Sequence, residues 1–380
     1  MARPRPAAVL FASIAVLASL RAQQPATTSP PAVDPAITGA PFVVGAAELF
    51  GHVQFLASPE LAGRKSGSSE GAIAGAYVAA EFGKLGLTPA GVDGTFWQPF
   101  DRIELVVREV DGEPKVEQRT ITCRNVLAWL PGSDPARADE YVLVAAHYDH
   151  LGRVGDAIHP GADDNASGTA GLLGVAKALA TGPRRPRRSV LFAAFDAEEQ
   201  ALSGAETFAR KPSRTLQQAV AMINLDMIGR GTLLDRKSMA LGKRLAGVPK
   251  GPAIGVLGTS QSPELAALTR AVFAAEQLPL FAPEDFGVLG PVIEKQAEGR
   301  SDHAPFERRR IPFLFFSNSE HDDYHQPTDT IATLDQTALW RTTACVYRTV
   351  LAIDALEARP TFVAKGKPAA EAAGQEPSGK

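Results

Sequence analysis

The chain has 380 residues with 39 basic and 42 acidic side chains, so its formal net charge of -3 offers no electrostatic basis for a nucleic-acid partner. Hydrophobic residues make up 45% of the sequence, which is enough for a core and excludes a wholly disordered chain. The length suits one large α/β domain or two smaller ones.

The first 22 residues have the pattern of a secretion signal. Arg3 and Arg5 supply a charged start, the apolar stretch 7–20 is short for a membrane span, and cleavage is expected near Ala22. That point lacks the cysteine of a lipoprotein anchor, and no later stretch is apolar for long enough to cross a membrane. We therefore expect a protein exported to the periplasm or beyond, without stable membrane association.

One domain is expected over residues 46–357. It follows a Pro-, Thr- and Ala-rich segment, 23–45, that is predicted to be a disordered linker, and it precedes a tail, 358–380, that is also predicted to be disordered. Irregular loops over the site are predicted for 278–300. Helical spacing and capping residues predict helices over 46–56, 69–85, 166–180, 201–210, 263–275 and 334–356. Apolar runs between turn residues predict strands over 102–110, 120–130, 141–146, 189–196, 219–225, 253–257 and 311–317.

The alternation of strands and helices indicates an α/β fold. The strands at 141–146, 189–196 and 219–225 are apolar on both faces, as a sheet covered by helices requires. Asp111-Gly112, between the two early strands, suggests an antiparallel hairpin at the edge. We expect a three-layer sandwich in which helices cover both faces of a mostly parallel, mixed central sheet.

Residues of metal-ligand type lie at or just past the ends of these strands, or in loops. Imidazole and carboxylate groups are ligands that zinc takes in proteins. A mononuclear catalytic site commonly has three protein ligands, so a larger set favours two metals with one bridging carboxylate. The set consists of His147, Asp164, Glu199, Asp226 and His325.

Five segments in order resemble the M28 metallopeptidases, the co-catalytic zinc aminopeptidases, and the resemblance covers roughly residues 45–355. Each motif is weak alone: a His-x-Asp is often a polar loop pair, and Asp-Ala-Glu-Glu is often a helix start. Their common order makes the signal specific. The segments are His147-x-Asp149, Gly161-Ala-Asp-Asp164-Asn-Ala-Ser-Gly168, Asp196-Ala-Glu198-Glu199, Asn224-Leu-Asp226-Met-Ile-Gly229 and Tyr324-His325-Gln-Pro-Thr-Asp329-Thr330.

The resemblance implies two zinc ions per chain. One would be held by His147, Asp164 and Asp226. The other would be held by Asp164, Glu199 and His325, so that Asp164 bridges the two ions.

The resemblance also implies that Glu198 is the general base, which takes a proton from the metal-bridging water and passes it to the leaving amine. Asp149 would accept a hydrogen bond from the far ring nitrogen of His147. The residues alone agree on one point, because adjacent glutamates on an extended backbone point in different directions. Glu199 can therefore bind metal while Glu198 faces the substrate water. The direction of the Glu198 pKa shift stays open, since an apolar cleft and a nearby cation act oppositely.

Several neighbouring residues have two interpretations. Asp302, in the segment Ser301-Asp302-His303, either orients the substrate or the loop or caps a short helix. The Tyr324 hydroxyl either stabilises the oxyanion or packs. Asp163 either supports the ligands or faces solvent in a turn, which we prefer. Asp329 either supports the His325 loop or caps the last helix. The remaining histidines are expected to be loop or structural residues: His52, His150, His159 and His321.

Together these features predict an exported two-zinc aminopeptidase that acts on peptide or protein N-termini. The alternatives are a glutaminyl cyclase with one zinc, a carboxypeptidase or other amide hydrolase of the same family, and a non-catalytic binding or receptor domain. The last should have lost ligands or the base, and the sequence retains all of them. The sequence indicates no oligomeric state.

Two features fall outside this interpretation. Cys123 and Cys345 are too few for a disulfide framework and are expected to be separate buried thiols, although an exported protein permits a disulfide. The basic residues within 229–251 either rim the cleft and prefer acidic substrates or form solvated surface, and we prefer the second.

Overall fold

A computed structural model describes residues 33–110, 113–232 and 253–364. The predicted signal segment, most of the basic segment and the end of the predicted tail lie outside the described residues. Among the described residues, no helix is long and apolar enough to cross a membrane.

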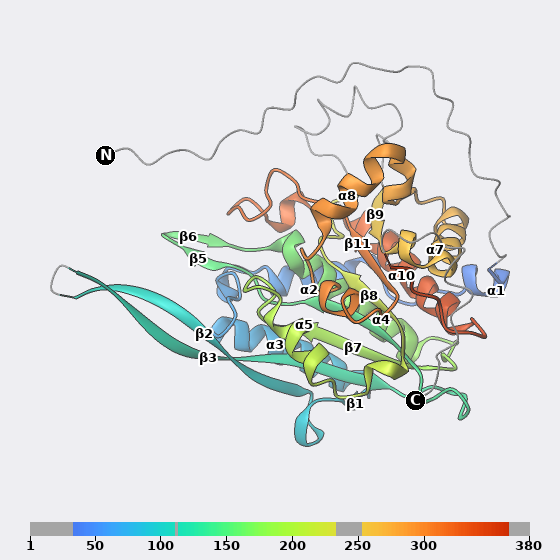
Figure 1. Cartoon of the computed structure of the whole chain (residues 1–380), viewed down its shortest axis with the longest axis horizontal. Coiled ribbons are helices and arrows are strands. Elements are labelled where there is room, and N and C mark those ends of the chain that lie inside the picture. Colours follow the sequence, from blue (N-terminus) through green and yellow to red (C-terminus); the bar gives the residue numbers. More distant parts are fainter. Residues whose placement is uncertain (1–32, 111–112, 233–252, 365–380) are drawn as a thin grey trace, which may run out of the picture.

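In the described part of the chain, nine strands form one mixed sheet in the order β1-β3-β7-β4-β8-β11-β9-β10, with β2 paired to β3 (Figure 1). The pairs β4–β7, β4–β8, β8–β11 and β9–β10 are parallel, whereas β1–β3, β2–β3, β3–β7 and β9–β11 are antiparallel. The strands are β1 (Thr88–Pro89), β2 (Trp97–Val110), β3 (Glu113–Leu130), β4 (Tyr141–His147), β7 (Ser189–Phe195), β8 (Ala219–Leu225), β9 (Ile254–Leu257), β10 (Leu280–Phe281) and β11 (Phe313–Ser317). A separate small hairpin joins β5 (Gly152–Val154) to β6 (Ala157–His159).

Helices cover both faces of the sheet, so the predicted three-layer sandwich is confirmed (Figure 1). Alternate residues of β4 enter different cores: Val142 and Val144 pack with one set of helices, and Tyr141 and Leu143 face the other. Each fully buried side chain of this size contributes about 1.5–3 kcal/mol. The first face carries α2 (Ala46–Leu56), α3 (Ser69–Lys84), α4 (Gly168–Thr181), α7 (Pro263–Ala275) and α10 (Gln336–Asp354), and the second carries α5 (Ser203–Arg210) and α9 (Ala304–Glu307).

Three predictions of irregular or disordered chain are wrong in part. The end of the predicted linker forms α1 (Pro35–Thr38), whose Ile37 is buried. The loop region contains α8 (Gly290–Ala297). The start of the predicted tail is held by a hydrogen bond from the Val363 N–H to the Gln261 carbonyl, 2.7 Å long. In α1 and in the start of the tail, burial of Ile37 and Val363 against the domain orders segments whose own sequence carries little periodicity.

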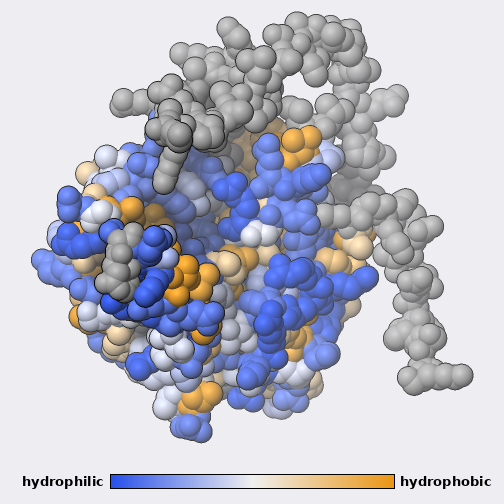
Figure 2. All heavy atoms as spheres, turned by 60° about the vertical axis from the view of Figure 1, so that its left-hand side comes forward, coloured by the Kyte–Doolittle hydropathy of each residue, from blue (hydrophilic) through white to orange (hydrophobic). Residues whose placement is uncertain are grey.

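The predicted hairpin is confirmed as a long arm made by β2 and β3, which projects from the body of the domain (Figure 1). Ile103, Leu105, Val107 and Val116 of this arm are exposed. Figure 2, which brings this side forward, shows hydrophobic patches among a largely hydrophilic surface. Within the described residues, Cys123 and Cys345 are both buried and free, as predicted.

Candidate metal centre

The parallel strands β4, β7 and β8 are neighbours, and their carboxyl ends bring the predicted ligands to one edge of the sheet. His147 is the last residue of β4, Asp226 follows β8, and Glu199 lies four residues beyond β7. Asp164 lies in the segment Ala162–Ser167, which precedes α4 and has a non-helical backbone at Asp164 itself. His325 comes from the loop after β11.

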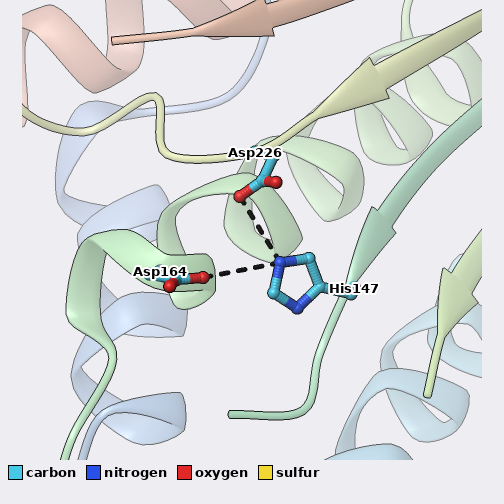
Figure 3. A group of neighbouring side chains, drawn as sticks. All are labelled: His147, Asp164 and Asp226. Atoms are coloured by element: carbon cyan, nitrogen blue, oxygen red, sulfur yellow. Dashed lines mark hydrogen bonds and ion pairs between the residues drawn. The ribbon is translucent and has the colours of Figure 1, made fainter. Parts of the chain in front are cut away.

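The first ligand cluster consists of His147, Asp164 and Asp226, whose side chains point toward one another (Figure 3). Nε2 of His147 lies 3.4 Å from Oδ1 of Asp226 and 3.5 Å from Oδ1 of Asp164. All three side chains are buried. One imidazole nitrogen and two carboxylate oxygens at this spacing can ligate a common divalent ion.

The second cluster lies on the other oxygen of Asp164. Nε2 of His325 is 3.1 Å from Oδ2 of Asp164 and 3.1 Å from Oε2 of Glu199. Asp164 therefore offers Oδ1 to the first cluster and Oδ2 to the second. This arrangement has the form expected of a carboxylate that bridges two ions.

His150 also lies in the second cluster, so the expectation of an uninvolved loop residue is wrong. Its side chain is 0% exposed, and its Nδ1 atom lies 2.7 Å from Oε1 of Glu199. Burial lowers the pKa of His150 to about 3. The sequence signal that could have found it is the second histidine of the segment His147-Tyr-Asp-His150, directly after a buried strand.

Glu198 lies between the clusters and the solvent, with 10% of its side chain exposed. Its Oε2 atom is 3.9 Å from Nε2 of His147. Burial raises the pKa of Glu198 well above its ordinary value, although the nearby His147 acts in the opposite direction. Burial is one of the two opposing effects on this pKa that the sequence left open.

Asp149 links the base to the first cluster. Its Oδ1 atom accepts a hydrogen bond of 3.1 Å from the Glu198 N–H and lies 3.7 Å from Nδ1 of His147. The Asp149 backbone oxygen is closer to that ring nitrogen, at 3.3 Å. The hydrogen-bonding contact with His147 therefore runs through the Asp149 backbone oxygen, and the predicted carboxylate lies just beyond hydrogen-bond distance.

Asp163 does not face solvent, so the preferred interpretation of this residue is wrong. It is fully buried, and its Oδ1 atom accepts a hydrogen bond of 2.7 Å from the Gly229 N–H. Its Oδ2 atom is 3.2 Å from Nε2 of His321. These partners lie far away in sequence, which explains why the turn alone suggested exposure.

Asp329 supports the Asp164 segment instead of capping the last helix. Its carboxylate accepts hydrogen bonds from the backbone N–H groups of Asp163 and Asp164, at 3.0–3.1 Å. Asp335 caps α10. Arg230 donates a hydrogen bond of 3.2 Å to Oδ1 of Asp329 and has 13% of its side chain exposed, so this end of the basic segment is a half-buried support and not solvated surface.

Asp302 is not a helix cap. The cap position of α9 is His303, and both oxygens of the buried Asp302 lack hydrogen-bond partners among the described residues. Burial raises the pKa of Asp302 to about 8. Beside it, Ser301 donates a hydrogen bond of 2.7 Å to Oδ2 of Asp226. Tyr324 stacks on the His325 ring with 3.8 Å between ring centroids, in agreement with the packing interpretation, and the role of its hydroxyl at the oxyanion stays a prediction.

Arg64 is a supporting residue that the sequence did not single out. Its buried guanidinium donates hydrogen bonds to five backbone carbonyls, from Leu56, Tyr148, Pro160, Gly161 and Asp164. Four of these carbonyls belong to the segment that carries His150 and Asp164. Arg64 therefore fixes the backbone beneath the second cluster.

The donor set of this structure fits zinc. It offers imidazole nitrogens and carboxylate oxygens, and one carboxylate lies between two clusters. Oε1 of Glu199 and both ring nitrogens of His150 are buried without a hydrogen-bond partner within the described ranges. A buried polar atom without a partner destabilises the folded state, and a bound cation would remove that cost for these atoms.

The fold and these clusters define the chain as an α/β protein with a candidate two-metal centre at the carboxyl ends of parallel strands. The model of Peptidase family M28 matches residues 125–251 and 253–350. This match covers more than half of the chain, which therefore belongs to peptidase family M28.

Individual relatives match over shorter stretches. A probable zinc metalloprotease of Pyrenophora teres f. teres is 39% identical over 114 residues, which cover 29% of this chain and 23% of that protein. A probable leucine aminopeptidase of Trichophyton verrucosum is 24% identical over 257 residues, or 65% of this chain and 62% of that protein. The chain thus aligns with about a quarter to two thirds of these curated relatives.

Solved structures share the fold. BSAP, a zinc aminopeptidase from Bacillus subtilis, superposes with a TM-score of 0.60 at 18% identity, covering 85% of this chain and 98% of that chain. A glutaminyl cyclase of Porphyromonas gingivalis superposes with a TM-score of 0.53 at 19% identity, covering 80% and 97%. The fold alone therefore does not distinguish the predicted aminopeptidase from the alternative glutaminyl cyclase.

Proposed function

We propose that this chain is an exported two-zinc aminopeptidase that hydrolyses N-terminal residues from peptides. The observation that carries the proposal is the placement of Asp164, which offers one carboxylate oxygen to each of two ligand clusters. Membership of family M28 and the names of its relatives agree with it. Export is inferred from the sequence pattern of residues 1–22.

His147, Asp164 and Asp226 would hold one zinc, and Asp164, Glu199 and His325 would hold the other. Bound zinc supplies Lewis acidity, which polarises a carbonyl group and makes water a stronger acid.

Glu198 would act as the general base. Its carboxylate borders the first cluster without serving either ligand set, so it is free to take up a proton and later return it to the leaving amine. Asp149 holds the Glu198 backbone through a hydrogen bond and also contacts His147. Asp149 would therefore keep the base and the first cluster in a fixed relation.

The substrate amine would be recognised by Asp302, whose two buried carboxyl oxygens lack hydrogen-bond partners among the described residues. A free N-terminal amine can donate hydrogen bonds to these oxygens, and an acetylated N-terminus has fewer N–H donors to offer. In this proposal Asp302 contributes to amine recognition, and Tyr324 keeps the His325 ring in place by stacking.

Hydrolysis of a leucine anilide with a free amine, compared with its acetylated form, tests the proposal. We expect cleavage of the free form alone, with loss of activity after treatment with a chelator. Cleavage of neither compound, together with cyclisation of an N-terminal glutamine peptide, would favour the cyclase. Release of a C-terminal residue would favour a carboxypeptidase. N-terminal sequencing of the protein recovered from the periplasm or medium tests export.

A further inference from the structure

The buried imidazole of His150 lies at the second ligand cluster and takes no part in the function proposed above. Its Nδ1 atom is 2.7 Å from Oε1 of Glu199 and 3.8 Å from Oδ2 of Asp164. We infer that His150 is a further zinc ligand, so that the second site has four protein donors, from Asp164, Glu199, His325 and His150. This inference rests on the proposed two-zinc centre.

The contact between His150 and Glu199 has the length of a hydrogen bond without its direction. At 2.7 Å the two atoms are close enough, yet among the described residues neither of them has a hydrogen-bond partner. The ring N–H direction and the carboxylate oxygen are therefore misaligned. Two ligands of one ion lie this way, because each directs a lone pair at the shared ion and not at its neighbour.

Two imidazoles flank the same carboxylate. Nδ1 of His150 faces Oε1 of Glu199, and Nε2 of His325 faces Oε2. The two ring centroids are 5.8 Å apart, and the rings are inclined at 66°. Each ring thus places one nitrogen within 3.1 Å of a Glu199 oxygen and within 3.8 Å of Oδ2 of Asp164, the two carboxylates that would hold the second ion.

The backbone around His150 is shaped to admit its ring. Gly161 has a φ of 60°, and a Cβ atom added there would lie 2.1 Å from the Asp164 carbonyl oxygen and 2.5 Å from two atoms of the His150 ring. Arg64 binds the carbonyls of Gly161 and Asp164, and its own carbonyl accepts a hydrogen bond from the His150 N–H. The fold therefore fixes His150 on the side that faces Glu199.

A fourth donor would make the two sites unequal. A site with four protein donors should release its ion more slowly than a site with three, and catalytic zinc can expand to five-coordinate, which leaves room for water at either ion. On dialysis against a chelator, the ion held by Asp164, Glu199, His325 and His150 should therefore leave last. The ion held by His147 and Asp226 should be the exchangeable one.

The test uses the full chain loaded with a magnetic cadmium isotope and carrying nitrogen-labelled histidine. Each imidazole bonded to cadmium shows a direct cadmium–nitrogen coupling. We expect coupling for His147, His325 and His150, and loss of the His150 coupling in His150→Asn. Asparagine keeps a donor near the position of Nδ1, so a mere hydrogen-bonding role would survive the change. Zinc affinity at the second site should fall more than about 100-fold, beyond the loss typical of supporting residues.

His52→Asn is the matched control, because it removes a half-buried imidazole of α2 that bonds to Tyr77. Its cadmium couplings and zinc affinity should equal those of the wild type. Two bound ions with coupling to His147 and His325 alone would overturn the inference and leave the proposed function standing. A chain that binds no divalent ion would overturn both. If His150→Asn does not fold, the coupling pattern of the wild-type chain decides alone.

Discussion

Replacing Arg64 by lysine tests whether one buried side chain supports the candidate centre. The change keeps the positive charge but exchanges a planar fork of five donors for an ammonium with three. Arg64 donates to five backbone carbonyls, so at least two of them lose their partner. Each buried carbonyl left without a partner costs about 1–3 kcal/mol, which predicts a loss of about 2–6 kcal/mol in the free energy of unfolding.

Urea unfolding in the presence of a chelator measures this loss without a contribution from bound metal. The matched control is Arg188→Lys, since Arg188 is equally buried, binds the carbonyls of Asp354 and Leu356, and lies at the opposite end of β7 from the site. Both variants should be destabilised. Only Arg64→Lys should also lower zinc affinity, because Arg64 binds the carbonyls of Gly161 and Asp164.

Two results would refute this reasoning. If the free energy of unfolding of Arg64→Lys lies within about 0.5 kcal/mol of the wild-type value, the variant behaves like a surface substitution. The lost hydrogen bonds would then not stabilise the fold as argued. A destabilised variant with unchanged zinc affinity would make Arg64 a core residue without influence on the centre.

Four further predictions follow from the site and the core. Glu198→Gln should retain both metals and the fold while turnover of leucine anilide falls about 100- to 10,000-fold, and near-wild-type turnover would remove Glu198 as the base. Asp164→Ala should lose metal from both sites together in metal analysis, whereas loss of one ion would argue against a bridge. Gly161→Ala should lower the thermal unfolding temperature and weaken zinc binding, because the new Cβ would meet the Asp164 carbonyl oxygen at 2.1 Å and the His150 ring at 2.5 Å; an unchanged affinity would contradict this. Burial raises the pKa of Cys345 to about 12 and also raises that of Cys123, so neither thiol should react with a disulfide reagent at neutral pH until denaturant is added.

Much of the sheet could be predicted from the sequence because its central strands are buried on both faces. Continuous apolar runs placed β4, β7 and β8 within a residue of their observed bounds. The polar residues at their ends marked the common edge where ligands gather. Both signals are local in sequence, so no knowledge of distant partners was needed.

The residues that the sequence misjudged depend on distant contacts. Asp163 is buried because its oxygens meet Gly229 and His321, and a pattern around the turn contains neither. The position of the His150 ring depends on its contact with Gly161, which lies eleven residues further along the chain. The sequence around His150 does not indicate this contact. Short elements such as α1 likewise form only where the domain offers a surface to pack on.

Hydrogen bonds hold both the N–H groups and the carbonyl groups of the backbone around Asp164 before any metal binds. The Asp329 carboxylate accepts hydrogen bonds from the N–H groups of Asp163 and Asp164. The Arg64 guanidinium donates hydrogen bonds to the carbonyls of Gly161 and Asp164. An anion and a cation from distant parts of the chain thus fix the same turn, and each satisfies backbone groups that burial would otherwise leave costly. The bridging carboxylate is therefore positioned by the fold itself, so metal binding needs little rearrangement. The same ligand residues on a loop without these two supports would bind metal with lower affinity.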